Sequence, residues 1–332
     1  MKILTIVVPS YNTELYIDEC LPTIISSKSI DDIEILLVND GSTDNTLKKA
    51  RYFEELYPQS IRVIDKENGG HGSVINRGIK EATGKYFKVI DGDDWVDTAA
   101  FNQLVSCLKR VDVDLVMNPY IIYNVATKKE TIVNKIKIPS NRIFTFEDYL
   151  NLLPLMALHA ITYRTDILRL NGIYLQEKCF YEDAEYDIYP MLYIKSFLYL
   201  EKPVYIYRIG TLTQSVNPVN AIRNKKMLSI ITDNLIRFYK NMPAEISTKR
   251  KKYVENQICH IIRNNYAVYL KMPIGIKVFN SIKKYDRALK KKSIELYHSS
   301  SSLSIKALRM NNYLVYIIEC QLFYLLRRKR GF

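Results

Sequence analysis

The chain has 332 residues, of which 48% are apolar and 25% are charged, and its 48 Lys and Arg against 35 Asp and Glu give a formal net charge of +13. This composition is that of a globular protein long enough for two compact units, and it excludes a disordered or collagen-like chain. The sequence shows no repeat at solenoid or propeller periods. It also has no run of the roughly 20 apolar residues that cross a bilayer, so we expect no membrane-spanning helix.

The cysteines and the amino terminus indicate the compartment. The five cysteines are odd in number and scattered, without a CxxC or Cys/His metal-ligand spacing, which predicts reduced thiols and argues against a structural zinc site. The apolar segment 3–9 is too short for a signal peptide, and we interpret it as a first buried strand. We therefore expect a cytoplasmic protein, with the inner face of the membrane as an alternative location.

The predicted elements alternate between strands and helices along the first 120 residues. Short apolar runs rich in β-branched residues predict strands near 3–8, 33–38, 61–64, 86–90 and 114–117. Apolar residues at spacings of three and four predict crossover helices over 47–56 and 74–82. This order is typical of an α/β protein with a parallel sheet, in which ligands bind beyond the carboxyl ends of the strands.

The junctions that follow three of these strands are unusual. Pro9 ends the first strand, and Asp40 ends the second, before Gly41 and a Ser-Thr helix cap. The fourth strand is followed by Asp91, Gly92, Asp93 and Asp94. Three carboxylates within four residues repel one another, and Mg²⁺ or Mn²⁺ held together with substrate phosphates would compensate them. An acidic helix start is the alternative interpretation.

A glycine-rich turn, with Asn68, Gly70 and His71, precedes the helix predicted over 74–82. Such a turn lets backbone amides approach a phosphate or a sugar closely. It matches neither the GxGxxG dinucleotide motif nor a Walker loop.

Taken in order, segments 7–12, 38–44, 68–70 with 76–79, 82–86 and 91–95 resemble the amino-terminal half of the family 2 glycosyltransferases. The resemblance implies a GT-A fold, which is a Rossmann-like twisted mixed sheet with helices on both faces. It also implies a nucleotide-sugar donor, usually a UDP-sugar, and a divalent metal, Mn²⁺ or Mg²⁺. Carried onto this chain, the nucleoside lies along Pro9, Ser10 and Tyr11, and Asp40 reads the uracil. The remaining donor contacts are Asn68, Gly70, His71, Asp91 and Gly92, with Asp93 and Asp91 as metal ligands and Asp94 as a further acid.

One departure from the family pattern concerns the second helix. Many relatives carry Ala-Arg-Asn where this chain has Val74, Ile75 and Asn76, so the arginine contact cannot be assumed. His71 and Arg77 are the polar candidates nearby, and a surface histidine and a solvated arginine are the alternatives.

The resemblance recurs around residue 182, where it implies a catalytic base. Four acids occur within six positions from Glu182 to Asp187, flanked by aromatic residues, and burial beside such residues raises a carboxylate pKa. In the family, the matching motif holds the catalytic base at the position of Asp183, with Glu182 beside it to orient the base or the acceptor. An acidic first turn of a helix is the alternative. Tyrosines stack on sugar rings and arginines pair with phosphates, so the acceptor candidates are His159, Tyr207, Arg208 and Gln214.

The last third is basic, and apolar residues at spacings of three and four, namely Leu228, Ile231, Leu235, Ile236 and Tyr239, predict that it is helical. Residues 1–220 contain 24 basic and 29 acidic residues, a net charge of −5, whereas residues 221–332 contain 24 and 6, a net charge of +18. Basic runs at 249–252, 290–292 and 327–330 favour contact with anionic lipid headgroups, although each alone is typical of a solvated surface. The apolar segment 313–326 fits equally well a helix buried in this protein or in a homo-oligomer. The tail lacks the motifs and the interleaved aromatic residues expected of a dedicated nucleic-acid-binding domain.

Together these observations predict three parts: a nucleotide-sugar-binding half (1–110), an acceptor-binding half with the base (111–220) and a basic helical domain (221–332). The predicted activity is inverting, metal-dependent sugar transfer to a lipid-linked or protein-linked glycan acceptor, in synthesis of a surface polysaccharide, a teichoic-type polymer or a protein-linked glycan. The alternative is a catalytically inactive nucleotide- or glycan-binding module of the same fold. The transferred sugar depends on side chains outside the shared motifs.

Overall fold

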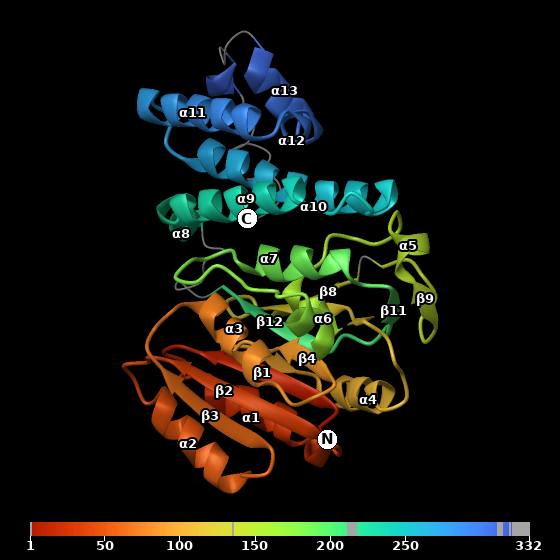
Figure 1. The fold of residues 1–332 in the computed structure, drawn as a ribbon. Helices are drawn as coiled ribbons and strands as arrows, with labels where there is room; N and C mark the ends of the chain where they lie inside the picture. Colours follow the sequence, from red (N-terminus) through yellow and green to blue (C-terminus); the bar gives the residue numbers. More distant parts are fainter. Residues whose placement is uncertain (1, 135, 211–217, 311–314, 319, 321–332) are drawn as a thin grey trace. The chain divides into compact units, whose positions relative to one another are not determined.

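A computed structural model describes residues 2–134, 136–210, 218–310, 315–318 and 320 of the chain. The chain divides into two compact units, Met1–Thr211 and Leu212–Phe332. The first unit contains the sheets, and the second is helical in its described residues (Figure 1).

An eight-stranded sheet is the frame of the first unit. Four of its strands, near one end, are parallel to one another, and the strand β10 that follows them is antiparallel. In spatial order the strands are β3 (Ile61–Lys66), β2 (Ile33–Asp40), β1 (Leu4–Ser10), β4 (Tyr86–Val89), β10 (Ile161–Arg164), β6 (Leu115–Met117), β11 (Ser196–Tyr199) and β9 (Ile143–Thr145). All five predicted strands are confirmed, in a sheet that is mixed.

The continuous apolar runs of the central strands are explained by burial on both faces. Every residue of β1 and β2 is buried, as expected for strands covered by helices on each side. Helices α1 (Ile17–Ile25), α2 (Thr46–Leu56) and α4 (Thr98–Leu108) contribute to the core on one face. Helix α3 (His71–Glu81) packs on the other face so closely that a Cβ at Gly78 would lie 2.2 Å from Val7 Cγ2. Helix α6 (Thr165–Leu170) packs against α3.

A second sheet of four strands was not predicted. Its order is β5 (Trp95–Val96), β12 (Tyr205–Ile209), β7 (Tyr120–Asn124) and β8 (Lys129–Val133). Strand β5 directly follows the acidic segment, and its Trp95 pairs with Ile206 of β12. The small sheet therefore places the 205–209 segment beside the three aspartates. The other short elements of this unit are η1 (Ile30–Asp32), α5 (Phe146–Tyr149), η2 (Leu158–Ala160), α7 (Asp183–Ile188) and η3 (Tyr189–Leu192).

The second unit confirms the predicted helical tail. The helices are α8 (Pro218–Arg223), α9 (Lys225–Lys240), α10 (Thr248–Lys271), α11 (Ile276–Lys292), α12 (Ile294–Ser299) and α13 (Leu303–Arg309). The apolar positions expected in α9 are buried, and α10 packs against α8, α9, α11 and α12. In the described part of the chain, no helix has the length and apolarity needed to cross a membrane. The basic run 327–330 and most of segment 313–326 lie outside the described residues.

Candidate active site

The predicted donor-binding loops meet at one edge of the large sheet. Strands β2, β1 and β4 are neighbours and parallel, so the residues after them share the same edge. The Gly92 amide donates to the Pro9 carbonyl at 3.0 Å, and a Cβ at position 92 would lie 2.8 Å from that oxygen. Glycine therefore lets the acidic loop close against Pro9 and Ser10. Tyr11 projects beside them with 52% of its surface exposed.

Asp40 anchors the glycine turn. Its carboxylate is 2% exposed and accepts hydrogen bonds from the amides of Gly69 and Gly70, at 2.9 and 2.8 Å, and from Lys66 Nζ at 2.5 Å. Gly70 has φ +82°, a conformation that glycine adopts without strain. Asn68 Nδ2 donates to the backbone carbonyl of Asp40 at 2.9 Å. Asp40 thus fixes the shape of the turn, and its contact with uracil stays a prediction.

His71 joins the donor loop to the predicted base motif. Its Nε2 lies 2.8 Å from Asp91 Oδ1, and its Nδ1 lies 2.6 Å from Glu182 Oε1. Burial alone would lower the pKa of His71, but the two carboxylates outweigh burial and raise it well above its usual value. A protonated imidazole donates from both nitrogens, so His71 is an imidazolium bridge between Asp91 and Glu182, the second of which lies 111 positions after His71 in the chain.

The His71 bridge supplies a positive charge to a chain that lacks the arginine found in the second helix of many relatives. Ile75, at the position of the family arginine, is fully buried among apolar residues. His71 lies one helical turn earlier on α3 and supplies a cation to the acids. Arg77, the other polar candidate, pairs with Glu81 on an exposed part of the helix. Of the two candidates, the structure therefore brings His71 into the site.

Gly72 permits this close approach. A Cβ at this position would lie 2.5 Å from the carbonyl oxygen of Gln176 and 2.9 Å from Glu182 Cγ. Any larger residue would push the first turn of α3 away from the segment that leads into α7.

The three acids of the loop have different surroundings. Asp94 is 1% exposed, and its carboxylate accepts from Tyr205 Oη at 2.5 Å and from the Arg208 amide at 2.7 Å. Asp91 accepts from His71, which lowers the pKa of Asp91 although burial alone would raise it. Burial, and then the charge of Asp91, raise the pKa of Asp93 to about 6. The Asp93 side chain makes no hydrogen bond with the described residues. Asp94 thus anchors the acidic loop to β12, and Asp93 is the acid whose carboxylate is available to a ligand.

The Arg208 side chain binds the backbone of the acidic loop. It is 7% exposed, and its Nε donates to the Asp93 carbonyl at 2.7 Å while Nη2 pairs with Glu19 at 2.5 Å. Its guanidinium lies 4.4 Å from the ring centroid of Trp95 and 5.0 Å from that of Tyr16, within cation–π distance. This placement gives no support to an acceptor contact at Arg208. The other acceptor candidate of this region, Gln214, lies outside the described residues.

An aromatic cluster lies next to the acids. The ring of His159 stacks on Tyr205 with centroids 4.6 Å apart and lies 4.4 Å from the ring of Tyr207. Burial lowers the pKa of His159 to about 4, so its imidazole is neutral. His159 Nδ1 is buried and has no hydrogen-bond partner among the described residues. Two predicted acceptor residues, His159 and Tyr207, are thus brought together beside Tyr205, which also bonds Asp91 at 3.2 Å.

Lys88 lies under this cluster and was missed in the sequence analysis. It is fully buried in β4 and donates to the carbonyls of His159 and Ile161 at 3.1 and 3.2 Å. Burial lowers its pKa to about 7. A lysine inside an otherwise apolar strand was the available signal, since a lysine is almost never fully buried without partners.

Asp183 and Glu182 differ sharply in accessibility. Glu182 is 2% exposed and bound to His71, whereas Asp183 begins α7 with its side chain accessible to solvent. Surrounding protein, and then the charge of Glu182, raise the pKa of Asp183 to about 6. Asp183 is therefore the carboxylate that a ligand can reach, and Glu182 is held in place behind it.

The residues present fit a divalent cation that is shared with a substrate. Among the described residues, no three His, Cys, Asp or Glu side chains are grouped so as to hold a metal ion. Mg²⁺ and Mn²⁺ commonly take one or two carboxylates plus substrate phosphates. The unpartnered Asp93 carboxylate, with Asp91 beside it, provides such a donor set.

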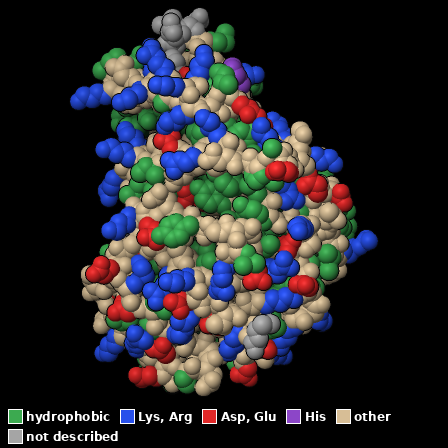
Figure 2. All heavy atoms as spheres, in the orientation of Figure 1, with side chains coloured by type: hydrophobic (Ala, Val, Ile, Leu, Met, Phe, Trp, Pro, Cys, Tyr) green, Lys and Arg blue, Asp and Glu red, His purple; other side chains and the backbone are tan. Residues whose placement is uncertain are grey.

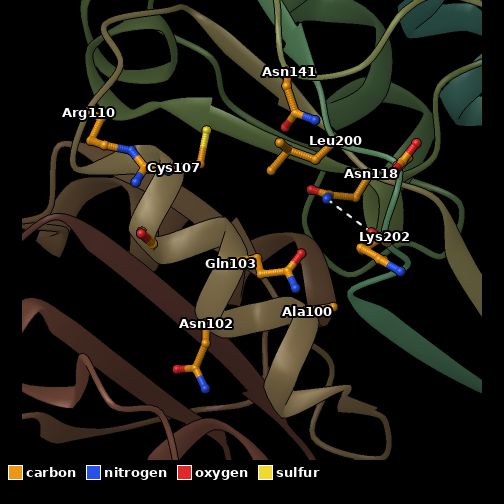
Figure 3. Close-up of a pocket in the computed structure, with 11 residues that line it drawn as sticks. Ala100, Asn102, Gln103, Cys107, Arg110, Asn118, Asn141, Leu200 and Lys202 are labelled. Atoms are coloured by element: carbon orange, nitrogen blue, oxygen red, sulfur yellow. Dashed lines mark hydrogen bonds between the residues drawn. The ribbon is translucent and has the colours of Figure 1, made fainter.

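A separate pocket of about 360 Å³ lies beside α4 (Figure 3). Gln103 and Cys107 reach it from α4 and Arg110 from the turn after this helix, while Asn118 follows β6 and Lys202 follows β11. None of the predicted site residues lines it. The candidate active site is therefore the loop cluster at the sheet edge and not this pocket.

Comparison with known proteins identifies the family that the chain resembles. The family model described as Glycosyl transferase family 2 matches residues 5–168. Residues 5–168 of the chain belong to glycosyl transferase family 2. It is 30% identical over 216 residues to the uncharacterized glycosyltransferase EpsJ of Bacillus subtilis, a match that covers 63% of this chain and 61% of EpsJ.

Two solved structures show the same fold. The crystal structure of S. aureus TarS 1–349 in complex with UDP-GlcNAc has a TM-score of 0.61 and 19% identity, and covers 100% of this chain and 92% of that chain. The mannosyltransferase PcManGT from Pyrobaculum calidifontis, in complex with GDP-Man and Mn²⁺, has a TM-score of 0.52 and 16% identity, and covers 97% and 86%. The expected GT-A fold with a helical carboxyl-terminal region is confirmed.

Proposed function

We propose that this protein is a glycosyltransferase that moves a sugar from a UDP-sugar to an acceptor hydroxyl with inversion. The observation that carries the proposal is the His71 bridge, which holds Asp91 of the donor loop and Glu182 of the base motif within 2.8 and 2.6 Å of one imidazole. Donor and base elements far apart in the sequence thereby belong to one site. Family membership supports the transferase class.

The donor side consists of the loops around Pro9, Tyr11, Asp40 and Asp91. The TarS complex contains UDP-GlcNAc and the PcManGT complex contains GDP-Man and Mn²⁺, so this fold accepts more than one base. We assign UDP from the motif around Asp40. Asp93 and Asp91 would hold Mn²⁺ or Mg²⁺, which when bound stabilises the negative charge of the leaving diphosphate.

The acceptor side centres on Asp183. Its accessible carboxylate takes the proton of the acceptor hydroxyl, and the hydroxyl oxygen forms a bond to the anomeric carbon as the bond to the diphosphate breaks. One displacement of this kind inverts the anomeric configuration. Glu182, fixed by His71, positions the base, and the neutral His159 and Tyr207 provide a surface for a sugar ring. The acceptor is a lipid-linked or protein-linked glycan of a surface polysaccharide, a teichoic-type polymer or a glycoprotein.

Nucleotide binding tests the proposal first. We would titrate UDP, GDP, CDP and ADP calorimetrically into the protein, each with and without Mn²⁺. Selective, Mn²⁺-dependent UDP binding is expected. Tight binding of a different nucleotide would overturn the uracil assignment, and absence of all nucleotide binding would favour an inactive module of the same fold.

Two variants then separate the roles of the acids. Asp93→Asn is expected to weaken metal-dependent nucleotide binding. Asp183→Asn should leave donor binding nearly intact and abolish transfer, because only the proton acceptor is lost. The reverse pattern would mean that the two roles are exchanged.

A further inference from the structure

A second hollow lies within the helical unit, where the ends of α9 and α11 meet the beginnings of α10 and α12. Its volume is about 600 Å³. Among the described residues, its lining contains one acid, Glu295, and five lysines: Lys240, Lys251, Lys290, Lys291 and Lys292. We refer to it as the lysine pocket. Figure 2 shows how densely Lys and Arg side chains cover the visible surface of these helices.

The one acid of the lysine pocket is already neutralised. Glu295 accepts from Tyr239 Oη at 2.5 Å and pairs with Lys251 at 3.4 Å. Lys292 pairs with Asp233 at 2.6 Å.

Three of its lysines lack such a partner. Lys240, Lys290 and Lys291 pair with no carboxylate of the residues that the structure describes. Three ammonium groups without a carboxylate partner among the described residues therefore line one hollow, and an anion bound there would be attracted to all three.

Helix dipoles explain only part of this arrangement. Lys240 and the run 290–292 occupy the last turns of α9 and α11, where the dipole favours cations. The run 249–252 instead occupies the first turn of α10, which contains no acid. Cations at that end are opposed by the dipole. An anion in the hollow would offset this repulsion as well as that among the unpaired lysines.

We propose that the lysine pocket binds phosphate groups of an anionic ligand. Ammonium groups are compact donors that suit phosphate oxygens without a fixed geometry. The volume admits more than one phosphate together with bound water. Two sources share this chemistry, namely the headgroups of anionic lipids and the phosphodiester backbone of a soluble polymer. The proposal does not depend on the donor site.

Tripolyphosphate titrated into the full chain tests the proposal. The pocket variant Lys240→Gln/Lys290→Gln/Lys291→Gln is compared with Lys226→Gln/Lys277→Gln/Lys284→Gln, whose residues lie on α9 and α11 outside the pocket. Both variants lower the net charge by the same amount. Loss of three contacts with an exposed phosphate should weaken binding about tenfold in the pocket variant, with little change in the control. Circular dichroism confirms that both keep their helices.

Further measurements identify which ligand provides the phosphate groups and which outcomes would overturn the proposal. Cosedimentation with phosphatidylglycerol–phosphatidylcholine vesicles, lost in the pocket variant alone, would assign lipid headgroups. Tripolyphosphate binding without such cosedimentation would assign a soluble phosphate polymer. An equal loss in both triple variants, or a loss in neither, would overturn the site. Binding that UDP displaces and that the pocket variant retains would also overturn it, because the phosphate would then occupy the donor site.

Discussion

Replacement of His71 by leucine should destabilise the sheet-containing unit at neutral pH. The change leaves Asp91 and Glu182 without their shared cation, and Glu182 is only 2% exposed. Removal of one partner from a buried ion pair costs about 3 to 5 kcal/mol. Because the Asp91 side chain is 22% exposed, we expect the lower end, about 3 kcal/mol. In a unit of this size that corresponds to a fall in melting temperature of roughly 6 to 12 °C.

The chain's single tryptophan provides the assay. Trp95 follows the acidic loop and packs against Arg208, so its fluorescence reports unfolding of this unit and not of the helical one. The matched control is Arg77→Gln on the same helix. Its ion pair with Glu81 is 43% exposed on the arginine side, and its loss should cost less than about 1 kcal/mol.

The effect of His71→Leu should depend on pH in a defined direction. The pKa of His71 is raised in the folded state, so its stabilisation is complete below the unfolded pKa and is lost as the pH rises through the folded one. The gap between wild type and variant should therefore narrow in alkaline buffer. A variant as stable as Arg77→Gln at neutral pH, or a gap that stays constant on alkalinisation, would refute the imidazolium bridge.

Two further predictions concern turnover. The pKa of Asp183 is raised to about 6, so kcat/KM should fall as the pH drops through this value and the base becomes protonated; a rate that is flat across this range would remove Asp183 as the base. Gly72→Ala should lower kcat by more than about tenfold, because the new Cβ would lie 2.5 Å from the Gln176 carbonyl and displace Glu182. Ala82→Gly, at the carboxyl-terminal cap of the same helix, is the control, and equal rates for the two variants would contradict the close-approach argument.

Local pattern predicted the frame of the fold. The strands near 33–38 and 86–90 were identifiable because strands buried on both faces are composed mostly of apolar residues, interrupted here only by Glu34 and Lys88. The positions of Asp40 and Asp91 followed, since the carboxyl ends of parallel strands share one edge. The helices of the tail were likewise predicted from spacings of three and four.

The small sheet and its consequences were not predicted. Strands β5 and β12 are two and five residues long and lie more than 100 residues apart. No local periodicity specifies which strand pairs with which. This pairing brings Arg208 and Tyr205 to the acidic loop, and it gives Arg208 a supporting role where the sequence had placed it among acceptor contacts.

The sequence by itself determined which residue types stand at the strand ends, because hydrophobic periodicity and turn chemistry are properties of neighbouring residues. Local pattern did not distinguish Asp91, Asp93 and Asp94, and their different roles were predicted from the family resemblance alone. The tertiary structure gave them different surroundings: His71 binds Asp91, the Tyr205 hydroxyl binds Asp94, and no side chain of the described residues hydrogen-bonds the Asp93 carboxylate. The ionisation of a carboxylate and its accessibility to a ligand depend on burial and on nearby groups, and the packed chain brings His71 to Asp91 from 20 residues away and Tyr205 to Asp94 from 111 residues away.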